Sequence, residues 1–308
     1  MRVVVVGANG FLGSHMVDTL VVGGHDVIAV DRFSSAPQFT HSPAQTITTS
    51  TPGDSELLNH LSHVDAVMDF LGASTPVLSA QHPTFDTDVT LPTAHTLIDA
   101  CVSAGVGHYY FASTGGAIYG DSGRESNRED DPPAPVSAYG KAKLAIENTL
   151  EHLRDAGDLN STVWRFSNPY GPRQNPAKKQ GLIAIALHHY LTSQPVPVMG
   201  SGDMIRDYIY VEDAIGYAAA FLGHTPHHSV YNVGSGVGAS VNEVLDVVSE
   251  VVGEEVHRTT IETPSGFVHH SVTNITRLLD EFGPRHVTSL AEGIRSTLDY
   301  LRARHTNS

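Results

Sequence analysis

The sequence predicts a doubly wound α/β fold, in which helices cover both faces of a parallel sheet, together with a smaller α/β cap. Two observations lead to this prediction. Short apolar runs rich in β-branched residues alternate with longer segments of helical periodicity through the first half of the chain. The first run, residues 2–6, ends in four consecutive valines, which is typical of a strand buried on both faces of a parallel sheet.

The composition is that of an ordinary globular chain. Its 308 residues, 40% hydrophobic and 17% charged, suffice for one large or two modest domains. No apolar run is long enough to cross a bilayer, and the N-terminal run is too short for a signal peptide. We therefore expect a cytoplasmic protein without a membrane partner. Cys101 is the only cysteine, which excludes an intramolecular disulfide and a cysteine zinc cluster.

The acidic charge balance argues against nucleic acid as the main partner. There are 18 basic and 33 acidic residues, so the formal net charge is −15. The 19 histidines include the adjacent pairs at 188–189, 227–228 and 269–270. Adjacent histidines lack the i, i+4 spacing of a helical metal site, so no metal site is expected.

Directly after residues 2–6 come three glycines, at positions 7, 10 and 13, and then a helical pattern to about Val22. A second strand is expected over residues 26–30. Glycines placed between a strand and a helix allow a tight turn and bring the backbone close to a pyrophosphate at the helix N-terminus. The unit predicts a dinucleotide-binding loop, and the alternative is a glycine-rich turn without a ligand.

Asp31 ends the second strand, 18 residues after Gly13. A carboxylate at this position can accept hydrogen bonds from the ribose hydroxyls of an adenosine. Because it would repel a 2′-phosphate, it favours NAD over NADP, although Arg32 beside it weakens this preference.

The rest of the first half continues to alternate between strand and helix patterns. A polar segment over residues 121–135 could form the rim of a site. The predicted elements are strands at 45–49, 65–71, 107–112 and 162–166, and helices at 54–61, 84–104 and from about Tyr139 to Ala156.

The pattern changes after Arg165, where loop-forming residues become more frequent. We assign residues 1–166 and approximately 209–233 to a cofactor-binding domain, and residues 167–208 and approximately 234–308 to a substrate-binding domain. The predicted elements are loops at 167–174 and 200–208, helices at 178–192, 211–222, 240–252, 274–282 and 289–304, and strands at 229–233 and 256–261.

Tyr139 and Lys143 lie four residues apart on a predicted helix and therefore project from the same face. A nearby ammonium stabilises a phenolate, so Lys143 could lower the phenol pKa from about 10 toward neutrality and make Tyr139 an acid/base. By itself the pair also fits a solvated helix face.

Five motifs in a fixed order set this pair in a wider context. Together they resemble the extended short-chain dehydrogenase/reductases, and among these the NAD-dependent nucleotide-sugar epimerases of the UDP-glucose 4-epimerase type. The resemblance covers nearly the whole chain and weakens after about residue 255. The motifs are Gly7-x-x-Gly10-Phe-Leu-Gly13, Tyr119-Gly120, Tyr139-x-x-x-Lys143, Arg165-Phe-Ser-Asn-Pro-Tyr-Gly171 and Arg206-Asp-Tyr-Ile-Tyr-Val-Glu-Asp213.

The resemblance implies a Rossmann domain and a role for each matching residue. Tyr139 would be the catalytic acid/base, and Lys143 would bind the nicotinamide ribose. Asn168 and Arg206 would contact the sugar diphosphate; their alternatives are a turn before Pro169 and a salt bridge to Asp207. The expected contacts to NAD are Gly7, Asn9, Gly10, Phe11, Leu12, Asp31, Arg32, Phe70, Leu71, Gly72, Tyr139 and Lys143.

The chain departs from the family pattern at three places. Gly115 stands where a catalytic Ser or Thr is common, so Ser113, Thr114 or a water must supply that hydroxyl; the alternative for both side chains is capping of the strand end. Residues 263–267 lack the arginine that usually completes the diphosphate clamp. Thr90 stands where an Asn is frequent.

The resemblance implies epimerisation of a nucleotide sugar, most simply UDP-glucose/UDP-galactose or the N-acetyl forms, through a transient 4-keto sugar. The absence of an acid pair after Thr114 argues against a 4,6-dehydratase. Two alternatives remain, a keto-sugar reductase of the same family and a non-catalytic NAD-binding regulator. Members of the family often pair, so a homodimer is possible.

Overall fold

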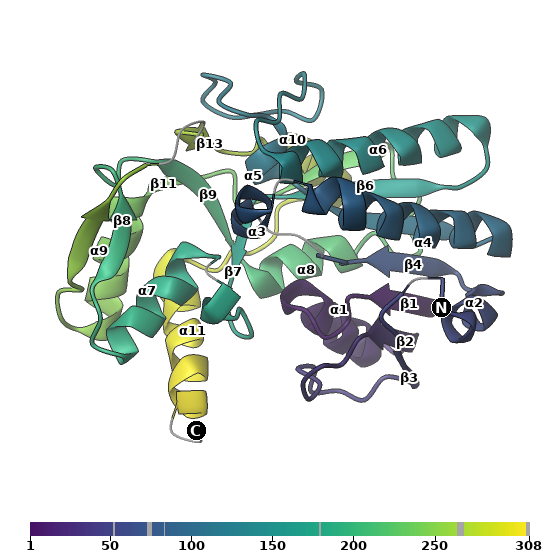
Figure 1. Cartoon of the computed structure of the whole chain (residues 1–308), viewed down its shortest axis with the longest axis horizontal. Coiled ribbons are helices and arrows are strands. Elements are labelled where there is room, and N and C mark those ends of the chain that lie inside the picture. The colour runs from purple at the N-terminus through teal and green to yellow at the C-terminus, as the bar shows by residue number, and fades with distance from the viewer. Residues whose placement is uncertain (52, 73–75, 83, 179, 264–267, 306–308) are drawn as a thin grey trace.

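A parallel seven-stranded sheet forms the centre of the larger part of the molecule (Figure 1). The computed structural model describes residues 1–51, 53–72, 76–82, 84–178, 180–263 and 268–305. The strand order is β10-β6-β5-β4-β1-β2-β3. The strands are β1 (Arg2–Val6), β2 (Asp26–Asp31), β3 (Gln45–Thr48), β4 (Ala66–Asp69), β5 (His108–Thr114), β6 (Ser161–Phe166) and β10 (Val230–Val233).

Helices cover both faces of this sheet, so the predicted doubly wound architecture is confirmed. The valines of β1 show the two faces: Val3 and Val5 belong to one apolar cluster, Val4 and Val6 to the other. The first cluster includes side chains of α1 (Phe11–Val22), α8 (Val211–Ala219) and α10 (Thr276–Phe282). The second includes side chains of α2 (Ser55–Leu61), α4 (Leu91–Ala104) and α6 (Ala138–Ala156).

The order of the strands reverses beside β1, because β2 follows on one side and β4 on the other. The connections that leave the carboxyl ends of β1 and β4 therefore run over opposite faces. This is the point at which open α/β sheets bind their ligands. Both the glycine loop after β1 and residues 70–72 after β4 lie at this edge.

A smaller α/β part lies beside the sheet, on the left in Figure 1. Its four-stranded sheet contains β7 (Asn168–Tyr170), β9 (Ile205–Tyr210), β11 (Gly238–Ser240) and β13 (His270–Ser271). Strands β8 (Val196–Met199) and β12 (Arg258–Ile261) pair separately. The other elements here are α7 (Leu182–Leu191), α9 (Val241–Val252), α11 (Leu290–His305) and the short 3₁₀ turn η2 (Pro176–Lys178).

Several predicted boundaries were wrong in this smaller part. Both segments predicted as loops contain strands, since β7 lies within 167–174 and β9 begins within 200–208; the two pair in parallel, with Asn168 opposite Tyr208. Proline, glycine and asparagine suggested loops, but pairing over a few residues with a distant segment overrides local preference. Strands β8, β11 and β13 were not predicted.

The predicted helix at 84–104 is divided. Its first turn is the π-helical segment η1 (Asp86–Thr90), and α4 continues from it. A separate helix, α3 (Pro76–Gln81), precedes it, and a four-residue helix α5 (Gly115–Ile118) follows β5. Pro92 near the start of α4 cannot donate a backbone hydrogen bond, which favours a change of helical geometry at this point. Within the described ranges, no helix combines the length and apolarity needed to cross a membrane.

Candidate active site

The glycines of the β1–α1 loop are required by close packing. Gly7 has φ +77, and a Cβ atom on it would lie 2.6 Å from the Phe70 carbonyl oxygen. A Cβ on Gly13 would lie 2.1 Å from the Gly7 carbonyl oxygen. Since neither contact tolerates a side chain, helix α1 starts close against the strand ends.

The N-terminus of α1 is not covered by a capping side chain. Gly10 is the N-cap residue and makes no side-chain cap hydrogen bond. The first helical residues, Phe11 and Leu12, are half-buried against the core at the start of the 12-residue helix. Amides in this arrangement, together with the helix dipole, fit the pyrophosphate of NAD.

Asp31 is held in position by two backbone amides. Its Oδ2 accepts from the Asn9 N–H at 2.9 Å and its Oδ1 from the Arg32 N–H at 2.7 Å. The carboxylate therefore lies beside the glycine loop, where ribose hydroxyls of a dinucleotide would arrive. The Arg32 side chain is exposed.

The Asn9 side chain is used within the protein rather than toward a ligand. Its amide donates to the Ser35 and Ala36 carbonyl oxygens at 3.2 and 3.4 Å, and its carbonyl accepts from the Gln38 N–H at 2.7 Å. Asn9 therefore holds the segment after β2 against the glycine loop. The Asn9 backbone N–H donates to Asp31 and its carbonyl accepts from the Gln38 side-chain amide, and the Asn9 contact to NAD stays a prediction.

Residues 70–72 continue the edge after β4. The Phe70 N–H donates to the Val6 carbonyl at 2.9 Å, and the Phe70 ring stacks on Trp164 with centroids 6.0 Å apart. The Leu71 N–H donates to the Asp69 carboxylate at 2.8 Å. Gly72 is exposed, and a Cβ on it would meet nothing within 4 Å. This segment is thus fixed against the glycine loop at its start and open at its end.

Tyr139 lies in the first turn of α6, beside the carboxyl end of β5. Ser137 caps the helix, and the Tyr139 N–H donates to Ser79 Oγ at 3.0 Å. The side chains of Tyr139 and Thr114 hydrogen-bond to each other. Strand end and helix start thus bring together a phenol and a hydroxyl that are 25 positions apart in sequence.

The predicted lowering of the Tyr139 pKa was wrong for the protein without cofactor. Burial raises the pKa of Tyr139 to about 12, the Asp86 carboxylate adds to this rise, and only the hydrogen bond from Thr114 opposes it. Lys143 does not lower the Tyr139 pKa because its ammonium is directed to the backbone carbonyl of Ala112.

Lys143 is buried, with 5% of its surface exposed. Its Nζ donates to the Ala112 carbonyl at 2.8 Å and lies 4.5 Å from the centroid of the Phe111 ring. Burial lowers the pKa of Lys143, and the carboxylates of Asp69, Glu147 and Asp86 oppose that shift. These carboxylates favour the charged ammonium.

The two hydroxyls considered for the third catalytic position have different surroundings. Ser113 donates to Glu147. The Glu147 carboxylate also binds the Arg165 guanidinium, with Arg165 Nη2 lying 2.7 Å from Glu147 Oε2. Thr114, the next residue along the strand, points to Tyr139. The strand alternation therefore separates them: Ser113 belongs to a buried ion-pair network, and Thr114 lies at the tyrosine.

Gly115 cannot carry the hydroxyl that is common at this position in the family. A Cβ on it would lie 2.7 Å from Thr273 Cγ2 and 3.1 Å from the Arg165 carbonyl oxygen. The smaller part of the molecule, which supplies Thr273, therefore packs directly on the turn after β5.

Asn168 and Arg206 lie on the strand pair that joins the two parts. The Asn168 amide donates to the Asp207 carbonyl at 2.9 Å, and its side chain lies next to Gly116. Arg206 donates to the carbonyls of Ile205, Val268 and His269 at 2.8, 2.5 and 3.3 Å.

Arg206 does not form the alternative salt bridge to Asp207. Asp207 is fully buried and accepts from the Ser235 N–H and hydroxyl at 2.8 and 2.7 Å and from the Thr273 hydroxyl. Most of the 263–267 stretch that lacks the family's arginine, residues 264–267, lies outside the described residues. Its neighbours at 268 and 269 hold Arg206 in place.

Asp86, Ser79 and Glu147 were not anticipated as parts of this site. Asp86 is 2% exposed, and its Oδ1 accepts from the Thr90 hydroxyl at 3.0 Å. Only its position one turn before Thr90, within a pattern otherwise typical of a surface helix, could have suggested it. Burial of an aspartate cannot be predicted from that pattern.

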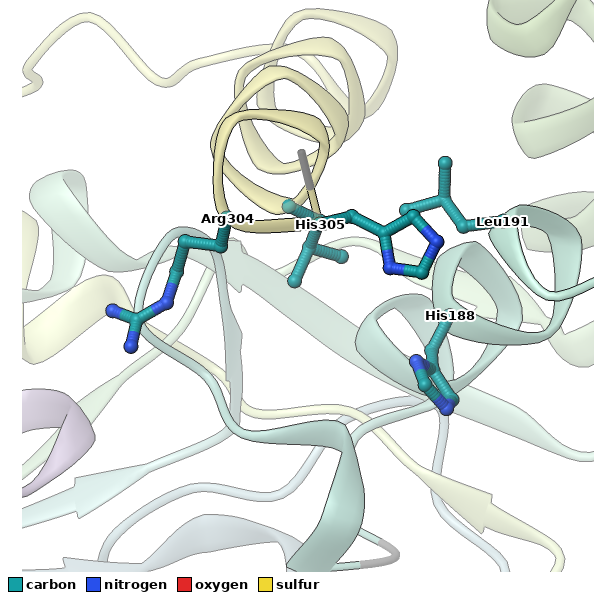
Figure 2. A pocket seen from close by; sticks show the side chains of 5 residues that line it. His188, Leu191, Arg304 and His305 are labelled. Carbon is teal, nitrogen blue, oxygen red and sulfur yellow. The ribbon is translucent and has the colours of Figure 1, made fainter. Parts of the chain in front are cut away.

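A surface pocket of about 190 Å³ lies between α7 and α11 and is separate from these residues. Figure 2 shows His305 directed from the end of α11 toward α7, which carries His188 and Leu191, while Arg304 points to the other side. Among the described residues, no group of three or more His, Cys, Asp or Glu side chains is placed to hold a metal ion.

The fold and the residues at the carboxyl edge of the seven-stranded sheet define a class of protein. It is a dinucleotide-binding α/β enzyme with a tyrosine–lysine centre and a cap beside it. Residues 3–234 match the model of the NAD dependent epimerase/dehydratase family, and the chain belongs to that family. The cofactor of the family is NAD, and the residues around the glycine loop fit it.

Relatives of known activity extend along the whole chain. The UDP-glucose 4-epimerase of Mycolicibacterium smegmatis is 31% identical over 98% of this chain and 99% of its own. The structure of the UDP-glucose 4-epimerase of Thermotoga maritima with UDP-glucose has a TM-score of 0.91 at 31% identity, covering 99% of this chain and 100% of that one. The complex of the Thermus thermophilus UDP-glucose 4-epimerase with NAD has a TM-score of 0.89 at 31% identity, covering 98% and 99%.

Proposed function

We propose that this chain is an NAD-dependent nucleotide-sugar 4-epimerase that acts on UDP-glucose/UDP-galactose or on the N-acetyl forms. The observation that carries the proposal is the arrangement of Thr114, Tyr139 and Lys143 at the sheet edge that also holds the glycine loop and Asp31. The relatives named UDP-glucose 4-epimerase along the full chain support the choice of reaction.

Each residue of the centre has a distinct task in this proposal. NAD, held at the glycine loop and Asp31, would supply the acceptor and then the donor of the hydride at the sugar carbon. Tyr139 takes the proton of the sugar 4-hydroxyl and gives it back. Thr114 holds the phenol oxygen in line, and Lys143 binds the nicotinamide ribose.

A phenol with a pKa of about 12 is protonated at neutral pH. Ionisation of Tyr139 therefore requires additional positive charge in the site, and an oxidised nicotinamide ring carries such a charge. In this proposal the base becomes available only after cofactor has bound.

For the substrate, the proposal places Asn168 and Arg206 at the sugar diphosphate. A guanidinium offers paired donors to phosphate oxygens, and Arg206 lies on the strand pair next to the site. Three of its contacts are with backbone carbonyls, through Nη1 and Nη2, and these contacts hold the guanidinium at this position.

The test is incubation of the purified protein with each UDP-sugar pair and NAD, read by chromatography. We expect interconversion of at least one pair, and we expect Tyr139→Phe to lose turnover by about 10²-fold or more while NAD affinity stays within a few-fold. Failure to interconvert any pair would contradict the proposal.

Two rival functions are distinguished by simple additions to this test. A keto-sugar reductase consumes reduced cofactor, whereas an epimerase retains NAD through its cycle, so the cofactor content of the purified protein separates them. A non-catalytic regulator would bind NAD but would show no turnover that depends on Tyr139.

The cytoplasm is the location we propose. A homodimer is the proposed assembly, by analogy with the family. Light scattering after size-exclusion chromatography measures it, and a mass of a single chain would contradict it.

A further inference from the structure

Three buried carboxylates surround the Lys143 ammonium, and they differ in how their oxygens are used. Asp69 accepts from the Tyr109 hydroxyl at 2.7 Å and from the Leu71 N–H at 2.8 Å. Glu147 is bound by the Ser113 hydroxyl and, through both oxygens, by Arg165. Both carboxylates are therefore satisfied within the protein.

Asp86 is different. One oxygen, Oδ1, accepts from the Thr90 hydroxyl, while Oδ2 is buried and has no hydrogen-bond partner in the part of the chain that the structure describes. Leaving a buried carboxylate oxygen without a hydrogen-bond donor is unfavourable. An oxygen in this condition calls for a partner that the described residues do not provide.

The position of Asp86 indicates where that partner binds. The π-helical turn η1 packs against α6, the helix that carries Tyr139 and Lys143. Asp86 interacts electrostatically with both of these side chains, and neither Asp69 nor Glu147 does so with Tyr139. Asp86 therefore belongs to the catalytic end of the site. A π-helical turn in place of a regular one is also frequent at functional sites.

We propose that Asp86 is a further ligand-binding residue of this site, and that its Oδ2 accepts a hydrogen bond from a hydroxyl group of the ligand held at Tyr139 and Lys143. The hydroxyl belongs either to a ribose of the cofactor or to the sugar. This inference rests on the proposed function only in the second case, because cofactor binding does not depend on the reaction.

The turn itself offers a matched control. Asp88 lies two residues after Asp86 on the same π-helical turn and is exposed. Asp86→Asn and Asp88→Asn remove the same charge from the same element. Only Asp86→Asn can place an amide donor where the ligand would need an acceptor, while keeping an oxygen for the Thr90 hydroxyl.

The experiment is calorimetric titration of the full chain with NAD, and then with UDP-glucose in the presence of saturating NAD. For Asp86→Asn we expect the affinity for one of these ligands to fall about tenfold or more, as for a lost hydrogen bond to a charged group. For Asp88→Asn both affinities stay within about twofold. A loss for NAD assigns the hydroxyl to the cofactor, and a loss for UDP-glucose alone assigns it to the sugar.

Thermal unfolding of each variant without ligand completes the test. Unchanged affinities in Asp86→Asn, or losses for both ligands together with a lower unfolding temperature, would overturn the proposal, since the second result is that of a packing role. If Asp86→Asn does not yield folded protein, Asp86→Ala, which introduces no donor, takes its place. Because NAD binding needs no turnover, a failed epimerase assay leaves the NAD titration decisive.

Discussion

At the scale of single residues, the main result concerns two neighbours on β5. From the sequence, Ser113 and Thr114 are equal candidates for the hydroxyl at the tyrosine. The structure directs Thr114 to Tyr139 and Ser113 to Glu147. Substitutions at these two positions should therefore have different consequences.

Thr114→Val should lower kcat by about 10²-fold, as when one donor to a reacting oxygen is removed, with little effect on unfolding. Ser113→Ala should keep most of the activity and lower the free energy of unfolding by about 1–2 kcal/mol, because Glu147 loses a buried donor. Steady-state kinetics and urea unfolding of both variants check this. The reverse pattern would assign the catalytic hydroxyl to Ser113.

The charge state of Tyr139 gives a second prediction. Since its pKa is raised to about 12, phenolate absorbance in the cofactor-free protein should be the same for the native chain and Tyr139→Phe up to about pH 10. Adding NAD should produce a difference at lower pH, because a cationic ring favours the phenolate. Ultraviolet difference titration measures both, and a difference at neutral pH without NAD would contradict the assignment.

At the scale of elements, the β1–α1 loop shows what a glycine is needed for. Gly7 and Gly24 share φ +77, but a Cβ on Gly7 meets the Phe70 carbonyl at 2.6 Å, whereas one on Gly24 meets nothing within 4 Å. Gly24→Ala should cost about 1–2 kcal/mol of unfolding free energy from backbone strain alone. Gly7→Ala should cost about 1–3 kcal/mol more from overlap. Chemical denaturation compares them, and equal losses would show that the contact relaxes.

The elements that could be predicted from the sequence are those with long periodic patterns. The run at 2–6, the glycine spacing and the helix carrying Tyr139 are local signals, and they led to the sheet, the loop and the tyrosine–lysine pair. Strands β7 and β13 could not be predicted, because three- and two-residue pairings depend on a partner far away in the chain. The partners of Asp86 and Arg206 could not be predicted either, because packing decides which side chains are buried and which backbone carbonyls they meet.

At the scale of the whole molecule, one carboxylate connects helix α10, residues 224–227 and strand β10 by hydrogen bonds. Glu281 on α10 accepts from His224, from His227 and from the Tyr231 hydroxyl on β10. Burial by itself would raise the pKa of Glu281, but these hydrogen bonds outweigh it and lower the pKa to about 2. The ionised form is thus favoured by folding.

The lowered pKa of Glu281 determines in which direction the stability changes with pH. The folded pKa of about 2 lies below the unfolded value of 4.5, so the stabilisation by Glu281 is complete above the unfolded pKa and is lost as pH falls toward 2. The difference in unfolding temperature between the native chain and Glu281→Gln should be largest near pH 5 to 7 and shrink below about pH 4. A difference that is constant down to pH 2.5 would contradict this account.

The sheet order has a consequence for how the chain is made. Strand β6 ends at Phe166, but its outer neighbour β10 begins only at Val230, after residues 167–229 have been synthesised. During translation, β6, which carries the buried Trp164, therefore remains the unpaired edge of the sheet, and exposed apolar edges favour aggregation. The nascent chain should need protection by a chaperone until residues 230–233 leave the ribosome.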